Sequence, residues 1–281
     1  KGKGFDRMDD EVTYTASMDG KIEMQNDRIV VLPVHEVSGN AELAEGNIDF
    51  RGDIVIHGNV ESGVNIRATG SITIDGVAEA CMLEAGKDII LRGGMLGGNK
   101  ASVKTKGAIT AKFFEFTNIL CEGDLQADVL MDCSVICHGQ IRLTGRKGSI
   151  IGGKVQAIRG LIATSLGNDA EKRTEIFVGA GIDVYSRLRV MEKKIETTRE
   201  ELAKIEEGLE KFEILSKERG VSYTNDPRRT SLLRIKIKDS AMLASDEEEV
   251  RKLRILAESS RGACVSVIQE IYPGVIINMD E

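Results

Sequence analysis

Short runs in which apolar and polar residues alternate return at nearly even intervals along the middle of the chain. Each run opens with a glycine in the phrase Gly-x-(Ile/Val/Leu)-x-(Ile/Ala/Leu), as at residues 52–56 and 70–74. The intervals between successive phrases are 18, 16, 21, 16, 16 and 21 residues. Such intervals are too short for a helical repeat or a propeller blade and predict the coils of a β-solenoid. The phrases open at Gly52, Gly70, Gly86 (with one residue inserted), Gly107, Gly123, Gly139 and Gly160.

The same alternation predicts which side chains form the core. Successive side chains of a strand point to opposite faces, so one member of each pair faces inward and the next faces solvent. Equivalent strands of neighbouring coils then pair and build aliphatic columns along the axis. Glycine is expected at the corners because it adopts a positive φ without a steric penalty. The expected core includes Ile54, Ile56, Ile72, Ile74, Ile109 and Val155.

Beyond the solenoid the apolar period changes from two to seven. Apolar positions recur at steps of three and four, with Glu and Lys on the flanks, which is the heptad pattern of a coiled coil. A second, less regular helical stretch follows a turn at residues 220–227, so the two helices predict an antiparallel coiled-coil hairpin. The first seam is Leu188, Met191, Ile195, Thr198, Leu202, Ile205, Leu209 and Phe212. The second stretch contains Leu232, Leu233, Met242, Val250, Leu253 and Leu256.

These patterns divide the chain into four segments. Residues 1–38 are predicted to be an N-terminal β segment, in which the runs at 12–16 and 29–32 predict strands, and we expect this segment to be the end of an upstream domain. Residues 39–179 form a single-stranded, right-handed parallel β-helix. Residues 180–262 form the inserted coiled-coil hairpin, and strands in residues 263–281 return to the β-helix. The predicted fold class is mainly β with a helical arm.

Composition and charge narrow the class of partner. The 281 residues carry 38 Lys+Arg and 45 Asp+Glu, and this net charge of −7 disfavours a nucleic-acid partner. The sequence contains no apolar stretch near the ~18 residues of a membrane span, and no secretory signal opens it. Because it begins with Lys1 rather than Met, we expect a piece of a longer protein. Five cysteines without a C-x-x-C pair predict reduced, buried thiols in a cytoplasmic protein.

Two stretches contain residue types that could carry chemistry. Residues 148–155 match seven of the eight positions of a phosphate-binding P-loop, but Val155 stands where a Ser or Thr would hold magnesium. Cys133, Cys137 and His138, with Cys121 one coil earlier, are metal-ligand types. Val135 lies between the two thiols on the same strand face, so we interpret that face as core. The remaining histidines have no nucleophile beside them and are interpreted as exposed: His35 and His57.

The β-solenoid enzymes have patterns that differ from this one. Left-handed acyltransferases require a strict six-residue repeat, which the observed intervals break. Solenoid lyases and hydrolases gather acidic and basic clusters in a groove. Here the outward acidic residues Glu61, Asp75 and Glu84 are scattered singly. We therefore predict a protein that is not an enzyme, with no catalytic residue, cofactor or metal.

Three phrases, at residues 32–40, 46–50 and 145–153, resemble the flagellar assembly protein A family. The expected coiled-coil hairpin and residues 272–277 resemble the C-terminal half of that family, so the resemblance covers most of residues 20–281. It implies a cytoplasmic, non-catalytic bacterial protein linked to flagellar assembly or placement. Two features depart from the family: the turn at 97–100 is shorter, and bulkier residues follow it, namely Phe113, Phe114 and Phe116.

Residues 52–77 also resemble the C-terminal β-domain of the cell-division inhibitor MinC, which binds the ATPase MinD. In that family an Arg-rich stretch follows the last strand, whereas residues 78–82 hold no Arg, so the MinD-binding surface does not carry over. We predict a scaffold or adaptor whose partners are flagellar or polar-positioning proteins, with self-association and recruitment to the cell pole as further expectations. The alternative is a MinC-like regulator of a MinD-type ATPase.

Overall fold

The computed structural model describes residues 5–7, 14–17, 20–25, 28–220, 222–224 and 226–279. The chain forms two compact units: a solenoid unit of residues 1–179 and 262–281, and a helical unit of residues 180–261. Two antiparallel hairpins precede the first coil: β1 (Phe5–Arg7) with β2 (Tyr14–Ala16), and β3 (Lys21–Gln25) with β4 (Arg28–Leu32). Val12, part of one predicted strand run, lies outside the described residues.

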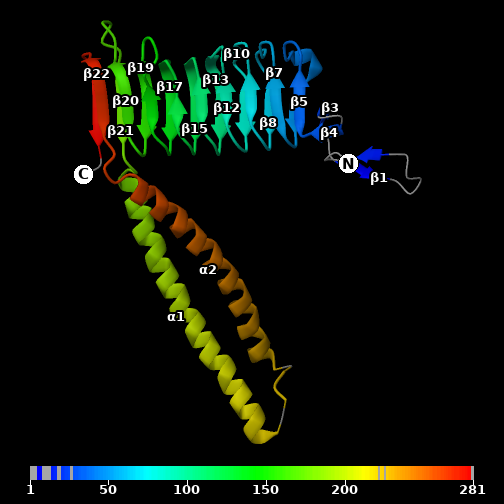
Figure 1. The fold of residues 1–281 in the computed structure, drawn as a ribbon. Coiled ribbons are helices and arrows are strands. Elements are labelled where there is room, and N and C mark those ends of the chain that lie inside the picture. The colour runs from blue at the N-terminus through cyan, green and yellow to red at the C-terminus, as the bar shows by residue number, and fades with distance from the viewer. Residues whose placement is uncertain are drawn as a thin grey trace. The chain divides into compact units, whose positions relative to one another are not determined.

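The solenoid consists of short parallel strands stacked coil on coil in three columns (Figure 1). The first column contains β5 (Val34–Val37), β7 (Asp53–Ile56), β9 (Ile72–Ile74), β12 (Ile89–Leu91), β14 (Ile109–Ala111), β16 (Leu125–Gln126), β18 (Ile141–Leu143), β20 (Leu161–Leu166) and β22 (Val265–Ile271). The predicted parallel β-solenoid is thus confirmed. Its right-handed sense stays a prediction.

The other two columns share the four long strands, which turn a corner of the coil. The second column contains β6 (Ile48–Phe50), β8 (Asn65–Ala68), β11 (Met82–Ala85), the later halves of the long strands, β21 (Thr174–Val178) and β23 (Val275–Met279). The third contains β10 (Ala78–Glu79) and the earlier halves of the long strands. The long strands are β13 (Met95–Thr105), β15 (Phe113–Cys121), β17 (Val129–Cys137) and β19 (Ser149–Ala157), and one 3₁₀ turn, η1 (Leu43–Glu45), precedes β6.

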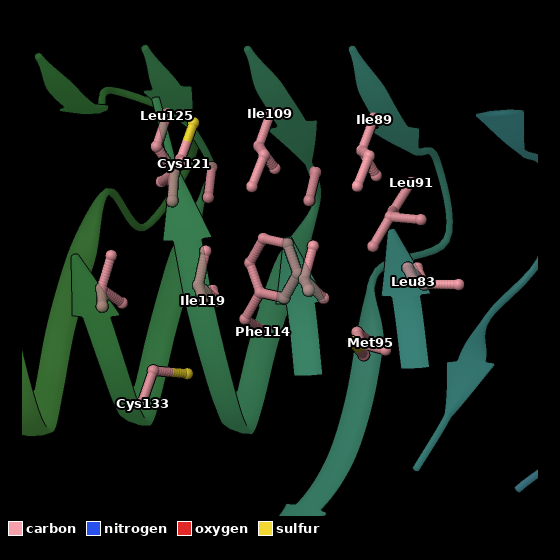
Figure 2. Close-up of a cluster of buried hydrophobic side chains, with 14 of the residues drawn as sticks. Leu83, Ile89, Leu91, Met95, Ile109, Phe114, Ile119, Cys121, Leu125 and Cys133 are labelled. Atoms are coloured by element: carbon pink, nitrogen blue, oxygen red, sulfur yellow. The ribbon is translucent and has the colours of Figure 1, made fainter. Parts of the chain in front are cut away.

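The core is a set of aliphatic columns that run through successive coils. Figure 2 shows Ile89, Ile109 and Leu125 at equivalent places on neighbouring strands. Fully burying one such side chain stabilises the fold by about 1.5–3 kcal/mol, so the column is the main source of stability. The six core residues named from the sequence have no exposed surface: Ile54, Ile56, Ile72, Ile74, Ile109 and Val155.

The repeated glycines have a different cause from the one expected. Of the seven that open the phrases, only Gly160 (φ 119°) and Gly52 (φ 159°, nearly extended) have positive φ. The others are required because the preceding coil touches them. A Cβ on Gly70 would lie 2.1 Å from Asp53 Oδ1, far inside van der Waals contact. The expectation that these glycines adopt left-handed turns is therefore wrong for most positions. Glycine is required there because the preceding coil lies too close for a side chain.

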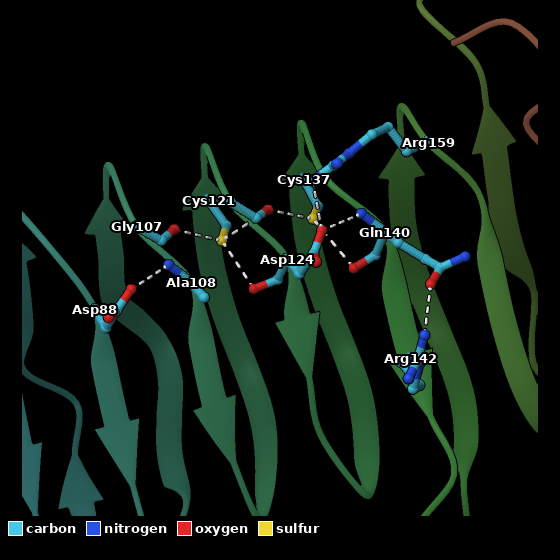
Figure 3. Close-up of polar contacts among 10 residues, drawn as sticks. Asp88, Gly107, Ala108, Cys121, Asp124, Cys137, Gln140, Arg142 and Arg159 are labelled. Carbon is cyan, nitrogen blue, oxygen red and sulfur yellow. Dashed lines mark hydrogen bonds and ion pairs between the residues drawn. The ribbon is translucent and has the colours of Figure 1, made fainter. Parts of the chain in front are cut away.

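The aspartates that crowd these glycines hold the coils together. Asp53 Oδ1 accepts a hydrogen bond from the Ser71 N–H of the next coil (2.7 Å). The same contact recurs between Asp88 and Ala108 (2.7 Å) and between Asp124 and Gln140 (2.8 Å), as Figure 3 shows. Each accepted N–H follows a glycine. One carboxylate therefore satisfies a backbone donor in the next coil, and the glycine leaves room for it.

The helical unit consists of α1 (Ile182–Arg219) and α2 (Pro227–Ser259). At 1.5 Å per residue, the 38 residues of α1 span ~57 Å. Gly220 ends α1 in the left-handed conformation (φ 63°), and Asp226 caps α2 by accepting the Arg228 N–H at 2.8 Å. Pro227 then occupies the first turn, where its missing N–H is harmless. Residues 221 and 225 of the predicted turn lie outside the described residues.

Candidate interaction surfaces

The seam predicted on α1 lies along one side of that helix. Ile195 (7% exposed) and Thr198 (5% exposed) are buried. The remaining seam residues are half-buried, whereas most residues between them are exposed. They are Leu188, Met191, Leu202, Ile205, Leu209 and Phe212. Phe212 also contacts the ring of Tyr223 in the turn, with centroids 6.2 Å apart.

The sheltered side of α2 differs from the apolar set named for that stretch. Sheltered positions follow each other at steps of four and three, but several carry polar side chains. Met242, one of the apolar residues expected along this helix, is 39% exposed. The heptad of α2 was therefore hidden, because an apolar pattern cannot reveal a seam that contains Lys and Asp. Its positions are Leu232, Lys236, Asp239, Leu243, Asp246, Val250, Leu253 and Ala257.

Ion pairs join the two helices along their flanks. Glu192 pairs with Arg254 (2.6 Å), and further along α1 Arg199 pairs with Glu247 (2.6 Å). A third pair joins Glu206 to Lys236 at 2.8 Å. Along these three pairs, residue numbers rise on α1 while they fall on α2. Each exposed pair contributes about 0–1 kcal/mol, so together they favour one alignment more than they add stability.

A hollow of about 890 Å³ lies along this helix pair. Its apolar lining is Ile195 and Val250, and the rest of its wall is Glu and Arg. Arg199 and Arg254 in that wall are held in ion pairs. The wall contains no His, Cys or Ser that could act as a nucleophile or transfer a proton near neutral pH.

The P-loop-like residues 148–155 lie in a strand and its corner. They coincide with most of β19, and that strand continues beyond Val155 to Ala157. No helix N-terminus follows to receive a phosphate. A Cβ on Gly153 would lie 2.2 Å from the Cys133 carbonyl oxygen, so the glycine serves coil-to-coil contact.

The thiols of the solenoid interior are buried and bonded to backbone. Cys121 Sγ donates to the Gly107 carbonyl oxygen at 3.3 Å, and Cys137 Sγ to that of Gly123 at 3.2 Å (Figure 3). Burial raises the pKa of the Cys133 thiol to about 11. Among the described residues, no group of three or more His, Cys, Asp or Glu is placed to hold a metal ion.

On the outside of the solenoid, charged side chains of successive coils contact one another in a row, here called a rung. These contacts were not predicted from the sequence. His57 lies between two carboxylates, with Nε2 2.8 Å from Glu36 and Nδ1 2.9 Å from Asp75. The hydrogen bond to Glu36, and to a smaller extent the one to Asp75, raises the pKa of His57 above its usual value. Arg92 continues the rung by pairing with Asp75 at 3.1 Å. Spacing by one coil along the chain was the signal that could have revealed these contacts.

The other two acidic residues singled out from the sequence also have partners in neighbouring coils. Glu84 pairs with Arg67 (3.0 Å), and Glu61 accepts the Leu43 N–H at 3.0 Å. His35 is exposed and lies against the Phe50 ring, with centroids 5.6 Å apart. Like the contacts at His57, the pairs of Glu84 and Glu61 join side chains or backbone of successive coils.

No helix in the described part of the chain is long and apolar enough to cross a membrane. Searches of curated proteins and of solved structures find no match to this chain. The local resemblance to MinC receives no support from these comparisons. The sequence model of the flagellar assembly protein A beta solenoid domain matches residues 33–281, which contain the whole coil stack and both helices. The chain therefore belongs to the flagellar assembly protein A family.

Proposed function

We propose that the chain is a non-catalytic scaffold or adaptor that acts in flagellar assembly or polar placement by binding other proteins. The family name supports the link to flagellar assembly. Two observations support binding rather than catalysis. The solenoid presents extended faces, and the hollow along the helix pair is lined by no His, Cys or Ser among the described residues. The proposed site of action is the cytoplasm, with recruitment to the cell pole.

The observation that carries the proposal is the helical unit. The core of the solenoid unit is built from the solenoid's own residues, between Ala41 and Val178 with partly buried neighbours at each end. Ordering two helices of 38 and 33 residues costs conformational entropy. A solenoid whose coils stabilise their neighbours gains little from such a unit. An external contact is the simplest reason for the unit to exist.

We further propose that α1 and α2 form an antiparallel coiled-coil hairpin. The heptad spacing of sheltered positions on both helices and the opposed order of ion pairs support this packing. We also keep four proposed segments: residues 1–38, whose last strand β5 already pairs with the β-helix, the β-helix at 39–179, the hairpin at 180–262, and returning strands at 263–281.

Removing the helical unit tests the adaptor role. In the bacterium that makes the protein, Gly181 is joined to Gly262 through a short Gly/Ser linker and the flagella per cell are counted. We expect normal levels of the shortened protein but fewer or misplaced flagella. At least one protein that the intact chain captures in a pull-down should be missing from the pull-down with the shortened chain. The matched control exchanges Arg199 and Glu247, which keeps the ion pair with its charges reversed. Normal flagellation and an unchanged set of partners in the shortened protein would rule the proposal out.

A further inference from the structure

The last coil of the solenoid leaves two strand edges without a partner. β22 pairs with β20, and β23 pairs with β21. Neither strand pairs on its other edge within the described residues, and Figure 1 shows β22 at one end of the coil stack. Unpaired N–H and C=O groups along such an edge are a template for another strand.

Within the described residues, the aliphatic columns reach this coil with their last side chains exposed. Leu166 and Ile176 have no exposed surface, yet their register partners in the last coil, Ile271 and Ile277, are 52% and 36% exposed. Met279, the partner of buried Val178, is 49% exposed. Terminal repeats of soluble solenoids normally have a polar outer face. This coil instead presents its core residues.

The two strands of the last coil carry almost no charge. Residues 265–279 contain one charged side chain, Glu270, in a chain whose net charge is −7. Protected edges usually carry Lys or inward-pointing charges. A charged partner would find one carboxylate along these two strands, whereas a second identical end would meet repulsion only from Glu270 and from Asp280 and Glu281, which follow β23 in the sequence.

We propose that two copies of this chain associate end to end through the last coil, with β22 of one copy beside β22 of the other. A two-fold axis through the β22 edge makes β22 antiparallel to its own copy, so the free donors and acceptors of that edge meet their equivalents. It also places the two sets of open columns against each other. The first coil is unlike the last, because Lys21 of β3 forms an ion pair with Glu36 of β5 there. The contact therefore closes as a dimer instead of continuing as a filament.

Sedimentation velocity of the 281-residue chain tests the proposal. Between about 1 and 100 µM we expect a concentration-dependent shift to twice the mass of one chain. Ile277→Lys should raise the dissociation constant about 100-fold or more, because a charge enters both sides of an apolar contact. The control is Ile136→Lys, in which an isoleucine of similar exposure (44%) on a lateral face is changed, and dimerisation should persist.

A second variant and a second measurement guard against misfolding of Ile277→Lys. If Ile277→Lys loses its β-type circular dichroism spectrum, Met279→Lys at the end of β23 is used in its place. Cys264 is the exposed cysteine, whereas the other four are buried, so a spin label there reports on the last coil. We expect dipolar coupling between labels that Ile277→Lys abolishes.

A chain that stays monomeric throughout the range overturns the proposal. So does a folded Ile277→Lys or Met279→Lys variant that dimerises like the wild type, because association would then use another surface, such as the helical unit. A monomer would leave the adaptor role untouched, since that role depends on the helical unit.

Discussion

Gly139 lies where the preceding coil leaves no room for a side chain. A Cβ there would be 2.3 Å from Asp124 Oδ1 and 2.4 Å from the Gly123 carbonyl oxygen. The same carboxylate accepts the Gln140 N–H, so the glycine and the aspartate act together: one makes room, and the other holds the next coil. At the residue scale, the repeated glycine phrase therefore reports contact between coils.

Adding one methyl group to such a glycine should destabilise the solenoid. We expect Gly139→Ala to lower the free energy of unfolding by about 1–3 kcal/mol, because backbone of the preceding coil must move. Gly39→Ala is the control: nothing lies within 4 Å of its Cβ position, and the change should stay below about 0.5 kcal/mol. Urea unfolding measures both. Equal effects of the two substitutions would show that packing between coils is not the reason for glycine.

The buried thiols should resist modification in the folded protein. Burial raises the pKa of Cys133 to about 11 and of Cys81 to about 12, so little thiolate forms near neutral pH. A thiol reagent should label one cysteine per native chain rapidly, namely Cys264, and all five after denaturation. Rapid native labelling of a second cysteine would contradict the predicted burial.

The raised pKa values of these thiols predict that the free energy of unfolding falls at alkaline pH. Burial raises the pKa values of these thiols above the ordinary value of 9.0, so the unfolded thiols lose their protons at lower pH than the folded ones. Their contribution to stability is complete below pH 9 and is lost as pH rises through about 11 to 12. Replacing Cys133 by Ala should weaken this alkaline loss, measured as the change in urea midpoint between pH 8 and pH 11.

Asp246 shows why one helix could be interpreted from the sequence and the other could not. It is 8% exposed and faces α1, where its Oδ2 lies 2.7 Å from Lys194 Nζ without hydrogen-bond geometry. At the element scale, the heptad of α1 is apolar and could be predicted directly. The register of α2 depends on partners supplied by α1, and no local pattern contains them.

Replacing this carboxylate should stabilise the helix pair while loosening its specificity. We expect Asp246→Leu to raise helix stability by about 1 kcal/mol or more, because a buried charge with an imperfect partner gives way to apolar packing. Polar residues at seam positions also fix alignment, so the variant should show additional oligomers. Thermal melting followed by helical circular dichroism measures the first effect. The exposed neighbour Ser245→Leu is the control, and a lower melting temperature for Asp246→Leu than for this control would refute the argument.

At the scale of the whole molecule, the sequence predicts the parts better than the contacts between coils. The Gly-x-Ile-x-Ile phrase is local, so the strands and the inward residues such as Ile54 and Ile74 could be predicted. The contact of Asp53 with Ser71, the rung at His57 and the open end at Ile277 join residues of different coils or depend on what lies beyond the last coil. They arise only when the coils stack, which single-sequence periodicity does not describe.

The central claim is that the solenoid is stable by itself and the helical unit exists for an external contact. Thermal unfolding of the purified chain with Gly181 joined to Gly262 by a short Gly/Ser linker tests it most directly. The account predicts loss of the helical signal, an unchanged β-type spectrum and a melting temperature for the strands within about 3 °C of the intact chain. A shortened chain that unfolds, or melts far below the intact one, would show that the helices belong to the stable core and would contradict the account.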